Sequence, residues 1–232
     1  PWGVAVDQTR GRLYVSLWAQ AAVAVIDTAA WKVAGRVEVE EHPNDLLLSP
    51  DGGRLFVANA NRNSVSVIDT AAGRVGETLV ATLSPDAAPG NTPNALALSA
   101  DGHRLFVSNA NINAVSVWDV AEPGKARSLG FIPVGWYPTS VRLAAGGTRL
   151  LVANGKGVIS DSNRNGPRPG FDPAAPTPDY IGGLFDGTVS FIELPDGEEA
   201  FTRKLAAWTE QAFACRPPAA DDVFTAEELE GH

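Results

Sequence analysis

The chain has 232 residues, 44% of them hydrophobic, which is enough to form a substantial core. Its 27 acidic and 18 basic residues give a net charge of −9, which argues against nucleic acid as a partner. A single cysteine, Cys215, excludes an internal disulfide, and with three scattered histidines it argues against a Cys/His zinc site. No stretch approaches the roughly 20 apolar residues that a membrane-spanning helix needs.

Four segments of the chain repeat one pattern, in which a proline precedes a leucine by 12 residues. The segments begin at Pro1, Pro43, Pro93 and Pro138, at intervals of roughly 42 to 50 residues. Short β-rich runs lie on either side of turn pairs such as Asp101-Gly102. Repeats of this length with several short strands are typical of propeller blades. We therefore predict an all-β fold, a β-propeller with four recognisable blades.

Spacing in the third repeat predicts four strands in chain order, here named A to D. They are Asn94–Ser99, Arg104–Asn109, Ala114–Val120 and Ser128–Val134. Because successive strands run in opposite directions, the D-to-A and B-to-C loops should lie on one face of the fold. The A-to-B and C-to-D turns should lie on the other.

The strand-B tetrapeptides are YVSL from Tyr14, FVAN from Phe56, FVSN from Phe106 and LVAN from Leu151. Together with the SPDG turn that begins at Ser49, they resemble the YVTN-repeat β-propeller family over about residues 1–195. Propellers of that family have about seven blades, so the resemblance implies a larger ring. The chain starts directly at a strand A and contains no methionine, and we interpret this as truncation or processing.

The fourth repeat is similar to a narrower subgroup, through GWYPT from Gly135, NGKG from Asn154, NGP from Asn165 and YIGG from Tyr180. In that subgroup a propeller precedes an alkaline-phosphatase-like hydrolase domain in an exported bacterial protein. The resemblance implies a periplasmic or extracellular location and a downstream domain as partner. The hydrolase's metal ligands and nucleophile lie in that later domain, and no segment here matches them, so the resemblance transfers no catalytic residue.

The loops of the D-to-A and B-to-C face carry the candidate binding residues. Asparagine suits these tight turns, since it tolerates the left-handed conformation, and the same amides are suited to a polar ligand. The Trp-Tyr pair is either a stacking surface or packing between blades, and the lysine is either an anion ligand or a solvated side chain. The candidates are Asn59, Asn61, Asn63, Asn109, Asn111, Asn113, Trp136, Tyr137, Asn154 and Lys156.

A Gly/Pro/Asn-rich insertion follows the fourth strand B and runs from Gly155 to about Asp186. Long loops in compact domains are functional or disordered, so it is interpreted as a recognition or docking loop, with a passive loop as the alternative. Inside it, Asp161, Asn163 and Asn165 fit the first half of a calcium loop. Two prolines that follow disfavour this site, and we predict no cofactor, with calcium as the alternative.

Residues 196–232 are predicted to form a second region, a helical linker and an acidic tail. The helix should span Glu198 to Ala214, with Asp196 and Glu199 as a capping box. Its apolar face comprises Phe201, Leu205, Trp208 and Ala212.

No catalytic residue is predicted, because His42 and His103 should lie on opposite faces and neither accompanies a nucleophile motif. We expect a non-catalytic scaffold that presents a ligand- or domain-docking face in a larger exported protein. Its partner would be the downstream domain or a polar small molecule, glycan or peptide. The alternatives are a propeller enzyme, either lactonase-like or a cofactor-dependent oxidoreductase, and a surface-layer or adhesion repeat.

Overall fold

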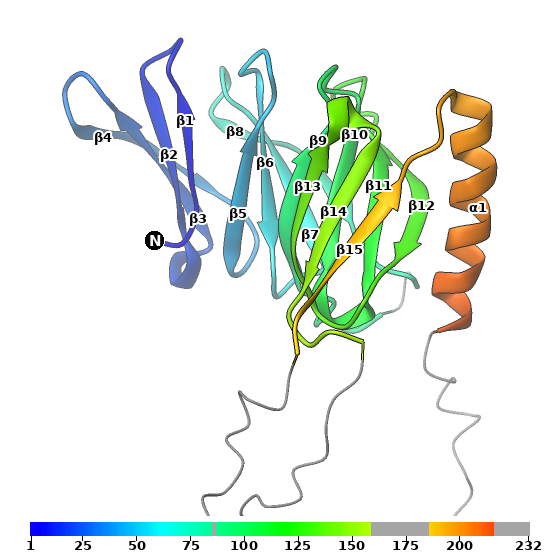
Figure 1. Ribbon diagram of the computed structural model, residues 1–232. Coiled ribbons are helices and arrows are strands. Elements are labelled where there is room, and N and C mark those ends of the chain that lie inside the picture. Colours follow the sequence, from blue (N-terminus) through cyan, green and yellow to red (C-terminus); the bar gives the residue numbers. More distant parts are fainter. Residues whose placement is uncertain (85–86, 159–185, 216–232) are drawn as a thin grey trace, which may run out of the picture.

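The computed structural model describes residues 1–84, 87–158 and 186–215, and its strands form four antiparallel sheets, here called blades 1 to 4 (Figure 1). Blade 1 contains β1 (Val4–Asp7), β2 (Arg12–Leu17), β3 (Ala22–Asp27) and β4 (Lys32–Glu38). Blade 2 contains β5 (Pro43–Leu48), β6 (Arg54–Asn59), β7 (Ser64–Asp69) and β8 (Arg74–Val80). Blade 3 contains β9 (Pro93–Leu98), β10 (Arg104–Asn109), β11 (Ala114–Asp119) and β12 (Arg127–Pro133). Blade 4 contains β13 (Pro138–Ala144), β14 (Arg149–Asn154) and β15 (Thr188–Glu193).

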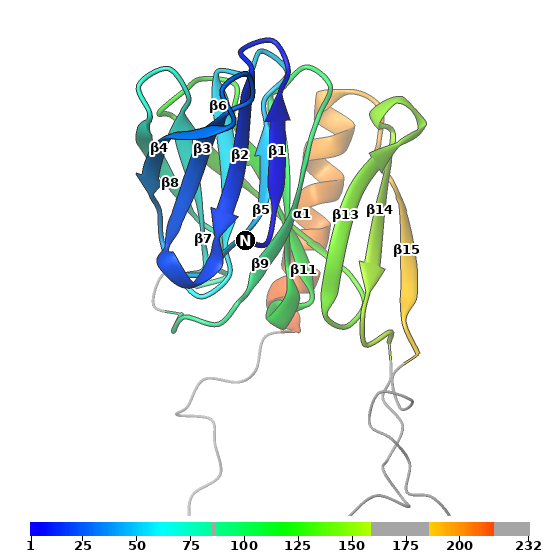
Figure 2. The same cartoon turned by 90° about the vertical axis from the view of Figure 1, so that its left-hand side faces the viewer.

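The strands of each blade pair in chain order, which confirms the predicted propeller fold. The first strands of successive blades contact one another, so β1, β5, β9 and β13 form a common inner wall (Figure 2). β10 has the predicted bounds, whereas β9 and β12 each begin and end one residue earlier than predicted. Three short 3₁₀-helices, Trp18–Gln20, Ala110–Ile112 and Ala145–Gly147, lie in connections between strands.

The cores lie between neighbouring blades. The central strands β6 and β7 are buried on both faces, because blade 2 stands between two other sheets. Phe56 and Val67 of blade 2, for example, share a core cluster with Leu96 and Trp118 of blade 3. By contrast, β1 buries every second residue, and β15 alternates half-buried with exposed residues, which is the pattern of a sheet covered on one face.

Blade 4 has three strands within the described residues, and the helix α1 (Glu198–Ala214) follows its last strand. The helix has the predicted bounds and packs beside β12 at the outer side of blade 3 (Figure 1). Phe201 and Leu205 enter the core between blades 3 and 4, as predicted from the apolar face of the helix. Thr209 Oγ1 accepts a hydrogen bond of 2.9 Å from the Phe131 backbone N–H, and so occupies the free edge of β12.

The predicted capping box is wrong. Gly197 is the N-cap residue and no side chain caps the helix, so Asp196 lies one residue too early to bond the first turn. Glu199 instead pairs with Arg203 one turn along the helix. Among the described residues, no helix is both long and apolar enough to cross a membrane.

Candidate functional site

The D-to-A and B-to-C loops share one face, as predicted, which we call the loop face. In three blades the two loops are joined by matching backbone hydrogen bonds. The donor and acceptor pairs are Ala60 N to His42 O (3.0 Å), Ala110 N to Thr92 O (3.0 Å) and Gly155 N to Tyr137 O (2.8 Å). The residue before each strand-A proline, His42, Thr92 or Tyr137, has a φ of 56° or 57°. The repeated conformation makes the loop face a regular backbone framework.

Three of the candidate asparagines lie inside the fold. Asn59, Asn109 and Asn154 end strand B of their blades, and at most 1% of each is exposed. Their Nδ2 atoms donate to hydroxyls of strand C, such as Ser66 (2.9 Å) and Ser190 (2.9 Å). Their Oδ1 atoms receive no hydrogen bond from the described residues, and buried oxygens of this kind are commonly satisfied by ordered water. A surface ligand does not reach these side chains, which corrects their assignment as binding residues.

Asn63 and Asn113 connect one blade to the next. Both adopt the left-handed conformation, with φ of 56° and 52°, which agrees with the turn chemistry expected of asparagine. Asn63 is buried, and its Oδ1 accepts hydrogen bonds from the backbone N–H groups of Gly90 (2.8 Å) and Asn91 (2.7 Å). Asn113 Oδ1 accepts one from Tyr137 N at 3.0 Å. These two residues therefore hold the linker that enters the following blade.

Asn61, Asn111 and Lys156 occupy matching places in blades 2, 3 and 4. Each backbone N–H donates to the carbonyl two residues before the strand-A proline; for Asn111 the distance is 3.1 Å, as it is for Lys156. The side chains of Asn61 and Asn111 are exposed, and that of Lys156 is half-buried. Asn61 Nδ2 donates to Glu41 at 3.0 Å, and this hydrogen bond, followed by the Arg62 charge, lowers the pKa of the Glu41 carboxyl. The three side chains form a line of polar groups across consecutive blades.

Trp136, Tyr137 and Lys156 lie together at the blade 4 end of this line. Trp136 is 43% exposed, and its backbone N–H donates to Gly157 O at 2.6 Å. The Lys156 ammonium lies 4.6 Å from the centre of the Tyr137 ring, a cation–π distance. Tyr137 is half-buried, with its ring beside Lys156 of its own blade, and its backbone N–H bonds to Asn113 of blade 3, whereas Trp136 is exposed and offers the stacking surface.

Sequence reasoning missed an aromatic pair at the other end of the loop face. The Trp18 and His42 rings stack with centres 3.8 Å apart and planes within 5°. Trp18 is 41% exposed and borders a hollow of about 360 Å³ that also touches Trp2. In the aligned repeats its place is taken by Ala60, Ala110 or Gly155. That departure from the repeat was the signal available in the sequence.

The acidic groups differ in their surroundings. Asp45 on the inner wall accepts backbone hydrogen bonds from Leu96 (2.8 Å) and Leu46 (3.0 Å), yet burial raises the pKa of its carboxyl.

His42 and His103 lie on opposite faces of the fold, as predicted. Within residues 1–84, 87–158 and 186–215, no group of three or more His, Cys, Asp or Glu side chains is arranged to hold a metal ion.

The calcium candidates Asp161, Asn163 and Asn165 lie outside the described residues, as does most of the insertion. Its two attachment points are described, because Asn154 at the end of β14 pairs directly with Thr188 at the start of β15. Both lie on the loop face, as predicted.

Comparisons with known proteins agree with this architecture. A family model described as "Lactonase, 7-bladed beta-propeller" matches residues 38–158. A chain of the hydrazine synthase of Kuenenia stuttgartiensis is similar in structure, with a TM-score of 0.57 and 25% sequence identity. The match covers 66% of this chain and 42% of that chain, so the present chain corresponds to less than half of it. The search of curated proteins found no match.

Proposed function

Since the chain belongs to the family of 7-bladed lactonase-type β-propellers, we propose that its blades form a binding scaffold whose loop face holds a polar ligand or a neighbouring domain. One observation carries the proposal: the exposed or half-exposed polar side chains of Asn61, Asn111 and Lys156 recur at the same backbone place in consecutive blades. A row of polar groups on consecutive blades suits an extended partner better than a small ligand.

The local geometry supports a partner that offers both hydrogen bonds and an apolar ring. Asn61 and Asn111 donate through Nδ2 to the neighbouring D-to-A loop, and no described residue donates to their Oδ1 atoms. Trp136 adds an exposed aromatic surface at the end of the row. Amide oxygens beside an aromatic ring are typical of sites for sugars and for peptide side chains.

The finer parts of the proposal rest on the resemblance described above. We assign residues 1–195 to the propeller and 196–232 to a linker, in an exported YVTN-type protein whose hydrolase domain docks on the loop face. The insertion that leaves and rejoins this face between Asn154 and Thr188 is the segment best placed for such docking.

A binding screen tests the scaffold. The chain is offered glycan and peptide panels, and hits are remeasured with an Asn61→Ala/Asn111→Ala/Trp136→Ala variant. Loss of several hydrogen bonds and one stacking contact should weaken binding by about tenfold to a hundredfold. Lys125→Ala on the opposite face is the control and should bind as the wild type does. Equal affinity of the triple variant would contradict the assignment of the loop face.

A second candidate, hydrolysis of lactones, is favoured by the family match. The same chain is assayed with γ- and δ-lactones, and Asp45→Asn is compared because its raised pKa suits proton transfer. Turnover that disappears in this variant would favour an enzyme over a scaffold.

A further inference from the structure

The outer edge of β15 pairs with no strand of residues 1–84, 87–158 and 186–215. In blades 1 to 3 the corresponding strand C pairs on both edges, with strand B on one side and strand D on the other. The helix α1 follows β15 but packs beside β12, and Figure 2 shows β15 as the outermost strand of blade 4. A free edge of this kind presents a row of backbone donors and acceptors that can pair with a further strand.

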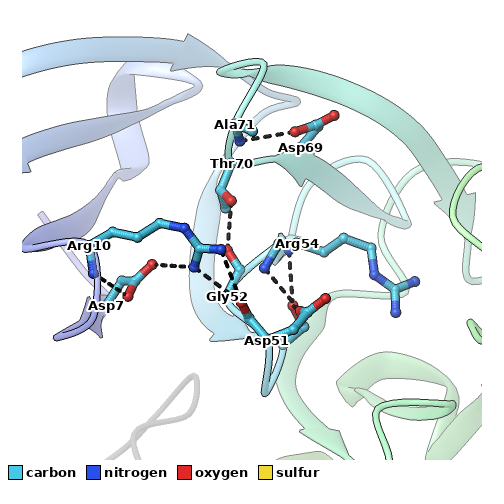
Figure 3. A network of polar contacts seen from close by, with 10 residues as sticks. Asp7, Arg10, Asp51, Gly52, Arg54, Asp69, Thr70 and Ala71 are labelled. Atoms are coloured by element: carbon cyan, nitrogen blue, oxygen red, sulfur yellow. Dashed lines mark hydrogen bonds and ion pairs between the residues drawn. The ribbon is translucent and has the colours of Figure 1, made fainter.

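The chain leaves β15 differently from the other third strands. In blade 2, Asp69 ends strand C, and its carboxylate accepts hydrogen bonds from the backbone N–H groups two and three residues further on, both at 2.9 Å (Figure 3). These bonds fix the turn into strand D, and aspartates at the same place accept such bonds in blades 1 and 3. In blade 4 this place is held by Glu193, which pairs with Arg149 of β14 at 2.5 Å, and the chain continues into α1. Blade 4 therefore has the edge that strand D covers in the other blades, but not the turn that leads into strand D.

Strand D has the same register in the three blades that contain it. The last residue of strand C faces a basic residue at the first place of strand D, which is Lys32, Arg74 or Arg127. The second residue of strand C faces an aliphatic residue at the sixth place of strand D, which is Val37, Leu79 or Ile132. Three strands of different sequence thus pair with strand C in one way.

The edge of β15 offers the same two contacts. Glu193 at its last place is a carboxylate with a side chain that is 65% exposed. Val189 at its second place is 52% exposed. The valines at that place in the other blades are fully buried, and each shares a core cluster with the sixth residue of strand D; they are Val23, Val65 and Val115. The edge therefore fits a seven-residue extended segment with a basic first residue and an aliphatic sixth residue.

The segments outside the described residues do not carry this pattern. Their basic residues are Arg164, Arg168 and Arg216, and the residues five places further on are Pro169, Pro173 and Asp221. None of the three is aliphatic, and proline cannot donate to a strand ladder. The sequence pattern therefore points to a segment of another polypeptide.

We propose that the outer edge of β15 binds an extended segment of a partner polypeptide as a fourth, antiparallel strand. The first residue of the segment is basic and pairs with Glu193, and the sixth is aliphatic and packs beside Val189. This site is separate from the loop face and does not depend on the function proposed there.

The probe is a capped synthetic peptide with the sequence of strand D of blade 1, KVAGRVE, which corresponds to residues 32–38. In an NMR titration of the whole chain, the peptide should shift the amides of β15, and intermolecular NOEs should place its sixth residue beside Val189. Shifts confined to another part of the molecule would overturn the proposal.

Two N-methylated peptides test for a strand ladder. One carries N-methyl groups on its fourth and sixth residues, and the other on its fifth and seventh. Because alternate residues of a strand direct their N–H groups to the same side, only one of the two peptides should bind. Equal affinities of the two would mean that the peptide adheres through its side chains, which would contradict strand pairing.

A charge exchange tests the contact with Glu193. Glu193→Lys should weaken binding of the probe by about twofold to fivefold, as expected for an exposed ion pair. The same variant should bind a peptide with glutamate at its first place more tightly than the wild type does. An unchanged preference between the two peptides would rule out the proposed register.

A matched pair of valine variants locates the site. Val189→Asp should weaken binding of the probe by at least about tenfold, because it places a charge against the aliphatic sixth residue. Val4→Asp changes a similarly exposed valine on the outer face of blade 1 and should leave the affinity unchanged. Similar weakening in both variants would exclude a specific site on β15.

Dilution of the chain without peptide tests the alternative occupant, a second copy. The β15 amides should keep their positions at all protein concentrations. Shifts that follow protein concentration, and that the probe does not displace, would assign the edge to a second copy and overturn the proposed partner.

Discussion

At the residue scale, asparagine serves several distinct purposes in this fold. At the end of strand B, Asn59 bonds the hydroxyls of the next strand inside the core. Four residues later, Asn63 adopts a positive φ and holds the linker into the following blade. Between them, Asn61 remains exposed. Position within the hairpin, rather than residue type, decides which asparagines are available to a ligand.

Replacement of Asn63 by alanine should destabilise the chain. It removes hydrogen bonds to Ala88, Gly90 and Asn91 and leaves buried backbone groups unpaired, at a cost of about 2–3 kcal/mol. Asn113→Ala removes the single bond to Tyr137 and should cost about 1 kcal/mol. Urea unfolding measures both.

The control for these variants is Ala21, which has the same left-handed conformation in blade 1, with a φ of 48°, but has no side-chain amide. Ala21→Gly relaxes the backbone without removing a side-chain hydrogen bond, so its effect should stay within about 1 kcal/mol. An Asn63→Ala effect no larger than this would show that backbone conformation, not the amide contacts, dominates.

The sequence could predict which residues form the turns of the loop face but not which of their side chains are buried. The Asn-x-Asn-x-Asn spacing correctly indicated turns with left-handed residues. The burial of Asn59, Asn109 and Asn154 arises because each faces strand C and the neighbouring blade, and that packing is absent from the local pattern. Trp18 was detectable only as an exception to the repeat.

At the element scale, the turn that begins at Ser49 makes a pH-dependent contribution to the stability of the fold. The Ser49 hydroxyl donates to Asp51 at 2.6 Å and is the main reason that the pKa of this carboxyl lies below its usual range. A lowered folded-state pKa means that this stabilisation is complete above the ordinary aspartate pKa of about 4 and is lost as the pH falls through the folded value.

Ser49→Ala should therefore raise the pKa of Asp51 toward its ordinary value. The contribution of this turn to stability should then depend less on pH in the acid range. A carbon-detected NMR titration of the carboxyl follows the change. Asp101, held in the matching turn by Ser99, is the internal control and should titrate as before. An unchanged Asp51 titration would contradict the role of the serine.

The docking of α1 on β12 depends on a glycine. Gly130 has a φ of 145°, and a Cβ there would lie 2.3 Å from Thr209 Oγ1 of the helix. Gly130→Ala should therefore cost about 1–3 kcal/mol and loosen the helix. Gly35 stands at the matching place of β4 with nothing within 4 Å, so Gly35→Ala is the control and should be nearly neutral.

Trp208 fluorescence reports whether the helix stays in place on β12. Urea unfolding measures the change in stability. Equal effects of the two glycine variants would mean that the close helix contact contributes little. The bounds of this helix were predictable from its 3.6-residue periodicity. Its packing against β12 was not predictable, because it depends on the missing side chain of Gly130 in a strand distant in sequence.

At the scale of the whole molecule, the outer faces of blades 1 and 4 remain apolar. Val4 and Val6 on β1 and Phe191 on β15 are more than half exposed. Phe191 stands where Val117 stands in blade 3, and Val117 is fully buried against blade 4. The same sheet position is therefore core in one blade and surface in the next.

Phe191→Thr should lower binding of a hydrophobic dye and concentration-dependent self-association, with little loss of stability. Val117→Thr is the matched variant and should cost about 1–3 kcal/mol, because it buries a hydroxyl. Light scattering and urea unfolding separate the two effects. A large loss of stability in Phe191→Thr would show that this side chain is already covered.

The pairing of Asn154 with Thr188 bears on the order in which the chain assembles. In blades 1 to 3 the second and third strands are joined by tight hairpins, and such local contacts form early. In blade 4 a long insertion separates the second strand from the third, so the two strands must first meet by diffusion of the chain. Blade 4 should therefore complete last during folding. Because α1 follows β15 directly and contributes Phe201 and Leu205 to the core between blades 3 and 4, it should dock in the same late step.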